Sequence, residues 1–493
     1  MHWNWEYIQN LIVKKLSSRG FLIFVIALFV IQALWIALSY RFPMLYDEAY
    51  HIYGIDLFSK QLSPLIMSQP SSYDVYGAFG HGGATLFHYL LSFPYRFISL
   101  FTSNLAVHVI AMRVINIIMA ATGVYLYAKL FSRLRVKAIY TNISLLIFTL
   151  IPITTFVAAT TNYDNLLFPL TALYLIWCVD ILQSKNIRTN DYLQLFLLGC
   201  VTSLVKSTFL PVFAASVVFL GVYLYRKNRK KFISKVIESF KKNSKKQMYI
   251  IASLTIIIIG LFSSVYFYNF VAYKTLQPGC NQVIGKVRCS KNYLGVRDEI
   301  TRETKGTRSE ITTADYISLW TMQMVNWSAM TGAHTTDKGV VVAKPIPAMY
   351  STIFIAGVLG ISLLLYAWRS LDKNISWYFL VMIMVSLTIT VFIQNYHVYL
   401  DLREPYAIQP RYLLTIVPIA IIMSVAAGGL IIRKVKPVYK LLFVAIFFAL
   451  LTQGGGVTTD ILLSKDSWYW NSEIVHKLNH GAKKILNPLV KGA

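Results

Sequence analysis

The chain has 493 residues, of which 56% are hydrophobic and 14% are charged. This balance excludes a water-soluble enzyme built around one core and indicates a polytopic membrane protein. The net charge of +26 would suggest nucleic acid as the partner of a soluble protein. Here the basic residues gather between apolar runs, as they do in the cytoplasmic loops of membrane proteins. We therefore expect membrane lipids, and no nucleic acid, as partners.

Apolar runs of spanning length divide the chain and predict an all-α fold with about eleven transmembrane helices. The predicted spans are 20–40, 106–128, 138–159, 165–183, 192–206, 208–225, 248–270, 348–367, 375–395, 411–432 and 441–463. The fifth and sixth join through Lys206-Ser207 and suggest a tight hairpin. An odd number of spans would place the two termini on opposite sides of the membrane.

The charges orient these spans. Lys14, Lys15 and Arg19 precede the first run, which predicts a cytoplasmic N-terminus and a run that leads outward. That run is too long for a typical signal-peptide core, so we expect it to remain as an anchor in the cell membrane. The predicted inner segments hold 25 of the 47 Lys and Arg residues but only 5 of the 21 acids. The outer face is therefore the one equipped for polar chemistry.

Two long outer segments complete the predicted organisation. The first outer loop, 41–104, contains amphipathic stretches that predict interfacial helices. Cys280 and Cys289 share the second outer segment and either form a disulfide in an oxidising compartment or remain free thiols. The predicted units are an N-terminal catalytic module (1–272), a small outer cap loop (273–347), C-terminal transmembrane helices (348–463) and an outer tail (464–493).

Charged side chains recur at the predicted outer ends of the spans. They are Asp47 and Glu48 after the first span, Asp164 in a short turn, Lys206 in the hairpin and Arg411 before the tenth span. Taken singly, they are compatible with a loop start, a helix cap, a snorkelling lysine and an interfacial anchor. Charges at membrane depth more often face a protein interior or a functional cavity. Together they predict a site that binds an anionic lipid-linked substrate and deprotonates a hydroxyl.

Other polar residues give weaker signals. Arg113, inside the second run, either pairs with an acid or marks a shifted helix boundary. His51, His81 and His88 share the first outer loop, but their spacing matches no compact metal signature. The sequence has no P-loop and no dinucleotide-binding glycine motif.

Several short motifs resemble the class C glycosyltransferases, membrane enzymes that take a sugar from a polyprenyl-phosphate donor. Tyr46-Asp47-Glu48-Ala49-Tyr50 resembles the acidic first-loop motif of this class, and Leu204-Val205-Lys206-Ser207-Thr208 resembles its lysine-containing turn. The motifs Asn162-Tyr163-Asp164-Asn165 and Gln409-Pro410-Arg411-Tyr412-Leu413-Leu414 are closer still to a family of uncharacterised bacterial membrane proteins grouped with that class. These motifs cover a few dozen residues. Many relatives carry a Pro-Pro pair where this chain has His81-Gly82-Gly83-Ala84-Thr85-Leu86, which puts a donor-binding role for that turn in doubt.

The resemblance implies an inverting glycosyltransferase that moves a sugar from a polyprenyl-phosphate donor to an acceptor hydroxyl of the cell envelope, at the outer face. The acceptor class stays open between a cell-envelope glycan, a teichoic acid, a lipid and a protein. In this interpretation the catalytic residues are Asp47, as base, and Glu48, which orients the acceptor or binds a metal. Asp164 and His81 bind the acceptor, and Lys206, Arg411 and Tyr412 bind the donor phosphate. No cofactor is certain; a divalent metal, if present, would use Asp47, Glu48 and Asp164.

Two other classes of function remain compatible with the sequence. A transporter or flippase for a lipid-linked sugar would also be polytopic and would also need cations for a lipid phosphate. Transporter sites, however, usually lie near mid-membrane at broken helices of repeated halves, and this chain has few mid-span charges and no clear repeat. A polysaccharide polymerase or ligase would share the outer-face setting without the Asp-Glu start.

Overall fold

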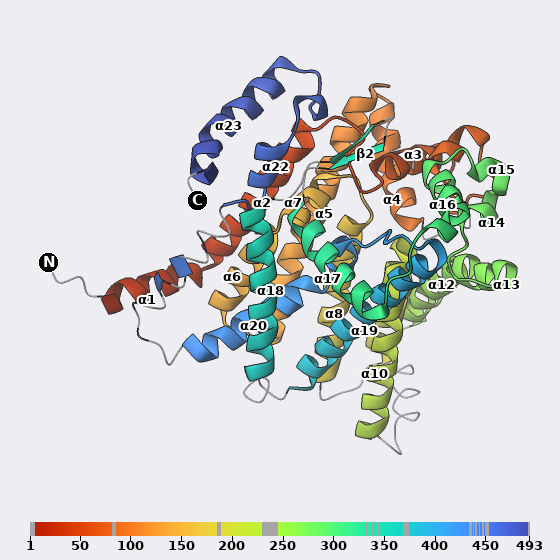
Figure 1. The fold of residues 1–493 in the computed structure, drawn as a ribbon. Coiled ribbons are helices and arrows are strands. Elements are labelled where there is room, and N and C mark those ends of the chain that lie inside the picture. Colours follow the sequence, from red (N-terminus) through yellow and green to blue (C-terminus); the bar gives the residue numbers. More distant parts are fainter. Residues whose placement is uncertain are drawn as a thin grey trace.

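A computed structural model shows an all-α polytopic protein (Figure 1). It describes residues 5–80, 85–184, 189–228, 245–330, 333–336, 339–342, 346–367, 374–432, 436, 438, 441–442, 444–445, 448 and 453–491. Figure 1 shows α3 (Glu48–Ser59) and α4 (Leu86–Ser99) towards one end of the helix bundle, whereas α10 (Leu210–Asn228) extends to the opposite end. The predicted all-α class is confirmed.

Seven helices of the described residues are long and apolar enough to cross a membrane. They are α2 (Arg19–Ser39), α5 (Leu105–Arg133), α8 (Asp164–Gln183), α10, α12 (Lys245–Phe262) with its continuation through η3 (Ser263–Phe267) and α13 (Tyr268–Tyr273), α18 (Pro347–Ala367) and α19 (Ile375–Leu402). Each contains or closely overlaps one of the predicted spans. Their apolar composition, at 1.5 Å per helical residue, gives them the reach of a hydrocarbon core.

The predicted third span is broken in two. Helices α6 (Ala138–Leu150) and α7 (Pro152–Ala159) meet at an angle of 70° and together form an eighth candidate span. Pro152 stands at the break, where its ring and missing N–H oppose continuation of the preceding helix. The bend turns α7 towards the end of α2, which it contacts.

The fifth, tenth and eleventh predicted spans do not form helices that meet the length criterion for a span in the described residues. The fifth and tenth correspond to α9 (Thr189–Val205) and α20 (Val417–Ile432), which are flanked by the short helices η2 (Ser207–Phe209) and η5 (Pro410–Leu413). The eleventh, 441–463, is described with gaps between residues 442 and 453, and its end forms α22 (Thr458–Leu463). Within the described ranges, seven or eight helices therefore meet the criterion for a span where eleven were predicted.

The segment 41–104, predicted as the first outer loop, contains α3, η1 (Ser71–Tyr76) and α4. Leu90, Phe93 and Phe97 form an exposed stripe on α4, while Phe87 and Leu91 on its other side are buried. This division into a packed face and an exposed apolar face is typical of a helix lying at a membrane surface. It agrees with the predicted interfacial helices.

The segment 273–347, predicted as an outer cap, consists of short elements in its described part. They are α14 (Cys280–Ile284), α15 (Lys286–Cys289), α16 (Tyr293–Glu303), η4 (Lys305–Thr307), α17 (Thr313–Ala329) and the strands β1 (Ala333–Thr336) and β2 (Gly339–Val342). The two strands pair antiparallel, a small departure from the predicted all-helical chain. Cys280 and Cys289 are joined by a disulfide, with their Cα atoms 5.7 Å apart.

An ion pair connects this cap to the first outer loop. Arg288 donates to both carboxylate oxygens of the buried Asp74, over 2.9 and 2.6 Å, and to the carbonyl of Gln69. The hydrogen bonds from Arg288 hold the pKa of Asp74 below its ordinary value, although burial opposes this shift. The disulfide at the adjacent Cys289 restricts where Arg288 can lie.

The Asp74–Arg288 pair predicts a pH dependence of the cap. A carboxyl group with a depressed pKa stabilises the fold above the ordinary Asp value of about 3.9 and loses this contribution as protonation proceeds below it. We expect the protection factors of amides in residues 280–303, which correct exchange for its intrinsic pH dependence, to change little between neutral pH and about pH 5 and to fall below about pH 4. Asp74→Asn should accelerate that exchange already at neutral pH, and unchanged exchange in this variant would contradict the assignment.

The disulfide is tested separately. Peptide mapping of protein from its native compartment, without reduction, should recover residues 280 and 289 in one linked peptide. Two free thiols would contradict the bond. Reduction should then accelerate hydrogen exchange around Arg288, because the constraint on its backbone is lost.

The bundle is packed around α5 and α8. These two helices make the most extensive contact between helices in the described chain. They approach closely at Gly123, where a Cβ atom would come within 2.1 Å of the ring of Phe168. At the ends of the chain, α1 (Trp5–Leu16) precedes α2, while η6 (Asp466–Trp468) and α23 (Glu473–Lys491) follow α22.

Candidate functional site

The site begins in the loop between α2 and α3. Tyr46 and Asp47 both adopt the left-handed backbone conformation, with φ of 66° at each residue. This conformation is costly for residues other than glycine and persists when the surroundings fix it. The carbonyl of Tyr46 accepts hydrogen bonds from Asn162 Nδ2 at 2.7 Å and from Arg411 Nη1 at 3.2 Å. Two segments distant in sequence, those of Asn162 and Arg411, therefore hold the strained loop.

Asp47 forms an ion pair with Arg411. Its Oδ2 accepts from Arg411 Nη2 at 2.7 Å, and the Asp47 side chain is 40% exposed, whereas that of Arg411 is 3% exposed. Arg411 also donates to Gln409 Oε1 at 2.5 Å and lies over the ring of Tyr46, 4.9 Å from its centroid. The cation is thus fixed inside the protein, and the carboxylate faces outward.

A second ion pair lies on the other side of Tyr412. Lys206, in the break between α9 and η2, donates to Asp164 Oδ1 at 2.6 Å, and both side chains are buried. The Lys206 ammonium lies 4.3 Å from the ring centroid of Tyr163 and 4.6 Å from that of Tyr412. The Arg411 guanidinium contacts the same Tyr412 ring, at 5.4 Å.

Five of the predicted site residues therefore form one continuous series of contacts. In order, they are Asp47, Arg411, Tyr412, Lys206 and Asp164. Two cations flanking a shared aromatic ring suit an anion that both can reach. Such an arrangement can bind a phosphate and leaves one exposed carboxylate next to it.

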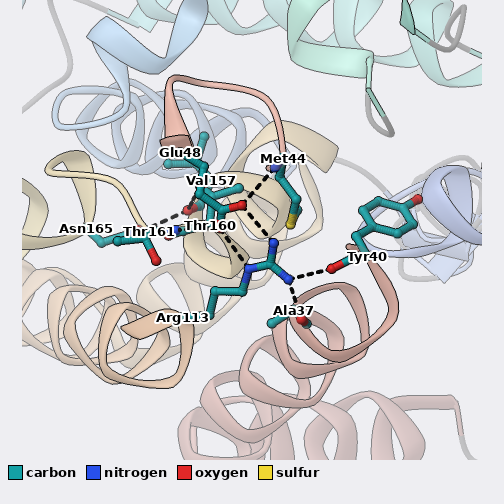
Figure 2. A network of polar contacts seen from close by, with 9 residues as sticks. All are labelled: Ala37, Tyr40, Met44, Glu48, Arg113, Val157, Thr160, Thr161 and Asn165. Carbon is teal, nitrogen blue, oxygen red and sulfur yellow. Dashed lines mark hydrogen bonds and ion pairs between the residues drawn. The ribbon is translucent and has the colours of Figure 1, made fainter. Parts of the chain in front are cut away.

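Glu48 lies behind this series in a third ion pair (Figure 2). Its Oε1 and Oε2 accept from Arg113 Nε and Nη2 at 2.8 and 2.7 Å, and both side chains are fully buried. Glu48 also accepts from the backbone N–H groups of Met44, at 2.7 Å, and Thr161, at 3.3 Å. Both carboxylate oxygens of Glu48 therefore accept hydrogen bonds from the protein itself, and these bonds hold the loop that carries Asp47.

Arg113 extends the same network to α2. Its Nη1 donates to the carbonyls of Ala37 and Tyr40 at 2.8 and 2.6 Å (Figure 2). Because Arg113 lies well inside α5, the interpretation that it marks a shifted helix boundary is wrong, and the alternative pairing with an acid is correct. The pair joins α2, α5, α3 and the turn after α7.

The turn 160–164 depends on an asparagine that sequence reasoning did not identify. Asn116 Oδ1, in the middle of α5, accepts from Asn165 Nδ2 at 3.1 Å and from the backbone N–H of Asn162 at 3.2 Å. Asn165 also donates to the carbonyls of Val157 and Thr160. An asparagine inside a long apolar run could have been recognised from the sequence as a contact residue, since polar groups in membrane helices usually bind one another.

The histidines of the first outer loop lie beside this site. His51 Nδ1 and His88 Nε2 are 3.0 Å apart in a buried stacked pair, and His51 also contacts the ring of Tyr163. Burial lowers the pKa of His88 to about 3, and burial followed by the proximity of His88 lowers the pKa of His51. Both imidazoles are therefore neutral near pH 7. His81, predicted to bind the acceptor, lies outside the described residues.

The proposed metal ligands do not converge. Asp47, Glu48 and Asp164 each pair with a different cation, namely Arg411, Arg113 and Lys206. Across the described residues, no three His, Cys, Asp or Glu side chains lie together in a way that fits a metal ion. These three residues, which the sequence offered as ligands if a metal is present, therefore do not form a metal site in this arrangement, and the proposed mechanism uses no metal.

Fold and site together define a helical membrane protein with a charged centre beside its first outer loop. No protein-family model matches the sequence, and no curated protein matches it. The structure is similar to a crystal structure of ArnT from Cupriavidus metallidurans in the apo state, with a TM-score of 0.46 and 11% identity. The similar region covers 96% of this chain and 70% of that chain. A likeness at this level assigns neither family nor activity, so the function is argued from the site.

Proposed function

We propose that the protein is an inverting glycosyltransferase that moves a sugar from a polyprenyl-phosphate donor to an acceptor hydroxyl at the outer face of the membrane. One observation carries the proposal. Of the three carboxylates of the site, Asp47, Glu48 and Asp164, Asp47 alone has a substantially exposed side chain. Its partner Arg411 contacts the same Tyr412 ring as Lys206. An exposed base thus lies beside two buried cations.

The two cations suit the donor. When the glycosidic bond breaks, the polyprenyl phosphate leaves as an anion, and it needs offsetting positive charge more than it needs a proton. Lys206 and Arg411 supply that charge from fixed positions, which lowers the cost of reorganisation in the transition state. Tyr412 keeps the two cations apart and presents them to one phosphate.

The structure also suggests how Asp47 becomes a free base. In the absence of a donor, Arg411 neutralises Asp47 at 2.7 Å. A donor phosphate competes for the same guanidinium and releases the carboxylate. Asp47 then takes the proton of the acceptor hydroxyl while the oxygen of that hydroxyl bonds to the anomeric carbon. The bond from that carbon to the phosphate oxygen breaks, and the phosphate keeps the electron pair.

The other predicted site residues have supporting roles in this proposal. Asp164 holds Lys206 through Oδ1, while its buried Oδ2 has no hydrogen-bond partner in the described part of the chain and can receive an acceptor hydroxyl. Glu48 positions the Asp47 loop through Arg113. An acceptor-binding role for His81 remains a proposal from the sequence.

Lys206 provides a test of donor binding. Lys206→Ala removes a charge that contacts phosphate in both the ground state and the transition state, so KM for the donor should rise and kcat should fall. A hydrogen bond to a charged group contributes about 1.5–3 kcal/mol, which predicts a loss of about tenfold to more than a hundredfold in kcat/KM. Lys206→Arg retains the charge and should retain part of the activity.

A matched control for this series is Lys60→Ala. Lys60 also pairs with an acid, Asp56, but lies exposed in the first outer loop. Its removal should leave donor KM within about twofold of wild type, because exposed ion pairs contribute about 0–1 kcal/mol. Equal effects of the Lys60 and Lys206 substitutions would contradict the phosphate-binding role.

The function itself is tested with purified protein in proteoliposomes that contain a polyprenyl-phosphate donor labelled in its sugar. We expect the label to leave the lipid and enter added cell-envelope acceptor, with one polyprenyl phosphate released for each sugar transferred. Label that crosses the bilayer while still attached to its lipid would instead identify a flippase and overturn the proposal.

A further inference from the structure

The C-terminal helix α23 has three distinct faces. One face packs on the protein through Asn479, which accepts from Trp35 Nε1 at 3.1 Å and donates to Ser39 Oγ at 3.0 Å. Lys483, on the same side, donates to the carbonyl of Ser464. These contacts fix how the helix is rotated relative to α2, and thus which residues face outward.

A second face is apolar and exposed. Ile474, Leu478 and Ile485 are 70%, 56% and 70% exposed, and their spacing of four and seven residues places them on one side of a helix. In the described part of the chain, no other element covers this side. Single exposed apolar residues are common, but three aligned on one helix form a stripe.

The third face is basic. Lys477 and Lys484, seven residues apart, are exposed beside the apolar stripe, and among the described residues Lys477 pairs with Glu473, which is about as exposed. The helix as a whole contains four lysines and one acid. An apolar stripe bordered by lysines is typical of helices that lie in the plane of a membrane surface.

The location of α23 agrees with that pattern. Trp35 and Ser39, its docking partners, belong to the last five residues of the spanning helix α2. The middle of α23 therefore lies beside the end of a span, at the level where lipid headgroups begin. Figure 1 shows α23 at the edge of the molecule, outside the main bundle.

We propose that α23 is an anchor that binds anionic phospholipid: its apolar stripe enters the headgroup region, and Lys477 and Lys484 contact negatively charged headgroups. The lysines favour an anionic bilayer over a zwitterionic one, because each charge near such a surface is attracted to it. The apolar stripe supplies the insertion, and the Asn479 contacts keep the stripe turned towards the lipid.

The experiment uses the full chain with a fluorophore sensitive to polarity at Leu478→Cys. Of the four native cysteines, Cys178 and Cys200 are buried and Cys280 is bonded to Cys289, so the introduced thiol is the reactive one. The protein is reconstituted in vesicles of phosphatidylcholine, with or without phosphatidylglycerol, that carry brominated acyl chains as quenchers. A probe at His480→Cys, an exposed position on the basic side of the helix, serves as the matched control.

We expect strong quenching at residue 478, more in the anionic vesicles, and weak quenching at residue 480. The double variant Lys477→Glu/Lys484→Glu should lower the ratio of inserted to water-exposed probe by about fivefold or more for each lysine charge lost. The double variant Lys274→Glu/Lys286→Glu, on exposed lysines of the segment 273–347, changes the net charge equally and should leave the signal unchanged.

Three results would overturn the proposal. A water-exposed probe at residue 478 in both kinds of vesicle would show that the helix is not inserted. Equal quenching with and without phosphatidylglycerol, insensitive to charge reversal of Lys477 and Lys484, would exclude an anionic lipid as the ligand. Disulfide cross-linking between two copies of the unlabelled Leu478→Cys protein, together with absence of quenching in the labelled protein, would show that a second copy covers the stripe.

Discussion

Asp47→Asn should lower sugar transfer by about 10²–10⁴-fold, the usual contribution of general-base catalysis. Asparagine keeps the shape and size of the side chain but cannot accept the proton of the acceptor hydroxyl. The buried Glu48–Arg113 pair remains intact in this variant, and Arg411 keeps its hydrogen bonds to Gln409 and to the carbonyl of Tyr46, so folding should persist. Single-turnover rates with saturating donor measure this effect without a contribution from product release.

The same substitution makes a prediction of opposite sign for binding. Because Asp47 occupies Arg411 in the structure, its neutral replacement removes a competitor of the donor phosphate. Donor affinity should therefore stay at the wild-type level or increase while turnover collapses. Asp56→Asn, on α3 in a half-buried position where it pairs with the exposed Lys60, lies outside the series of site contacts; it is the control and should transfer sugar nearly as wild type. Transfer by Asp47→Asn at the wild-type rate would refute the assigned base.

Glu48→Gln should destabilise the fold by about 3–5 kcal/mol, because it leaves the charge of Arg113 buried without its partner. Thermal or denaturant unfolding in detergent measures the effect. Arg113→Met should cost a similar amount, since it strands the Glu48 carboxylate. The double variant Glu48→Gln/Arg113→Met should cost less than the sum of the two, because it leaves no unpaired charge.

The control for this cycle is an exposed pair. Glu473 and Lys477 on α23 form an ion pair with side chains 80% and 76% exposed. Glu473→Gln should cost at most about 1 kcal/mol. An unfolding midpoint of Glu48→Gln equal to that of the Glu473 variant would show that the Glu48–Arg113 network does not hold the loop.

Much of the fold was readable from the sequence because lipid and protein impose simple rules on composition. The apolar runs predicted where the helices lie, and the charged residues that later form the site were found at the ends of these runs. The broken third span was also readable in principle, since Pro152 follows the last residue of a helix-compatible run. The β1–β2 pairing was not predicted, because two four-residue strands in a polar loop give little periodic signal.

The site was harder to predict because its contacts are distant in sequence. Glu48 and Arg113 are 65 residues apart, and Asp47 and Arg411 are 364 residues apart. The sequence indicated which charges lie near the membrane surface but not which cation takes which acid. For that reason Glu48 was grouped with Asp47 as a catalytic residue, whereas the structure places it in a closed buried network. The left-handed conformation of Tyr46 and Asp47 carries no sequence signature of its own.

The configuration of the product tests the central claim most directly. Among Asp47, Glu48 and Asp164, Asp47 is the one exposed carboxylate, and it acts as the base. The acceptor therefore attacks the anomeric carbon in a single displacement. Purified protein should be given a polyprenyl-phosphate sugar of known anomeric configuration, and the product linkage should be determined by NMR. The account predicts inversion at the anomeric carbon, and retention of the donor configuration would contradict it.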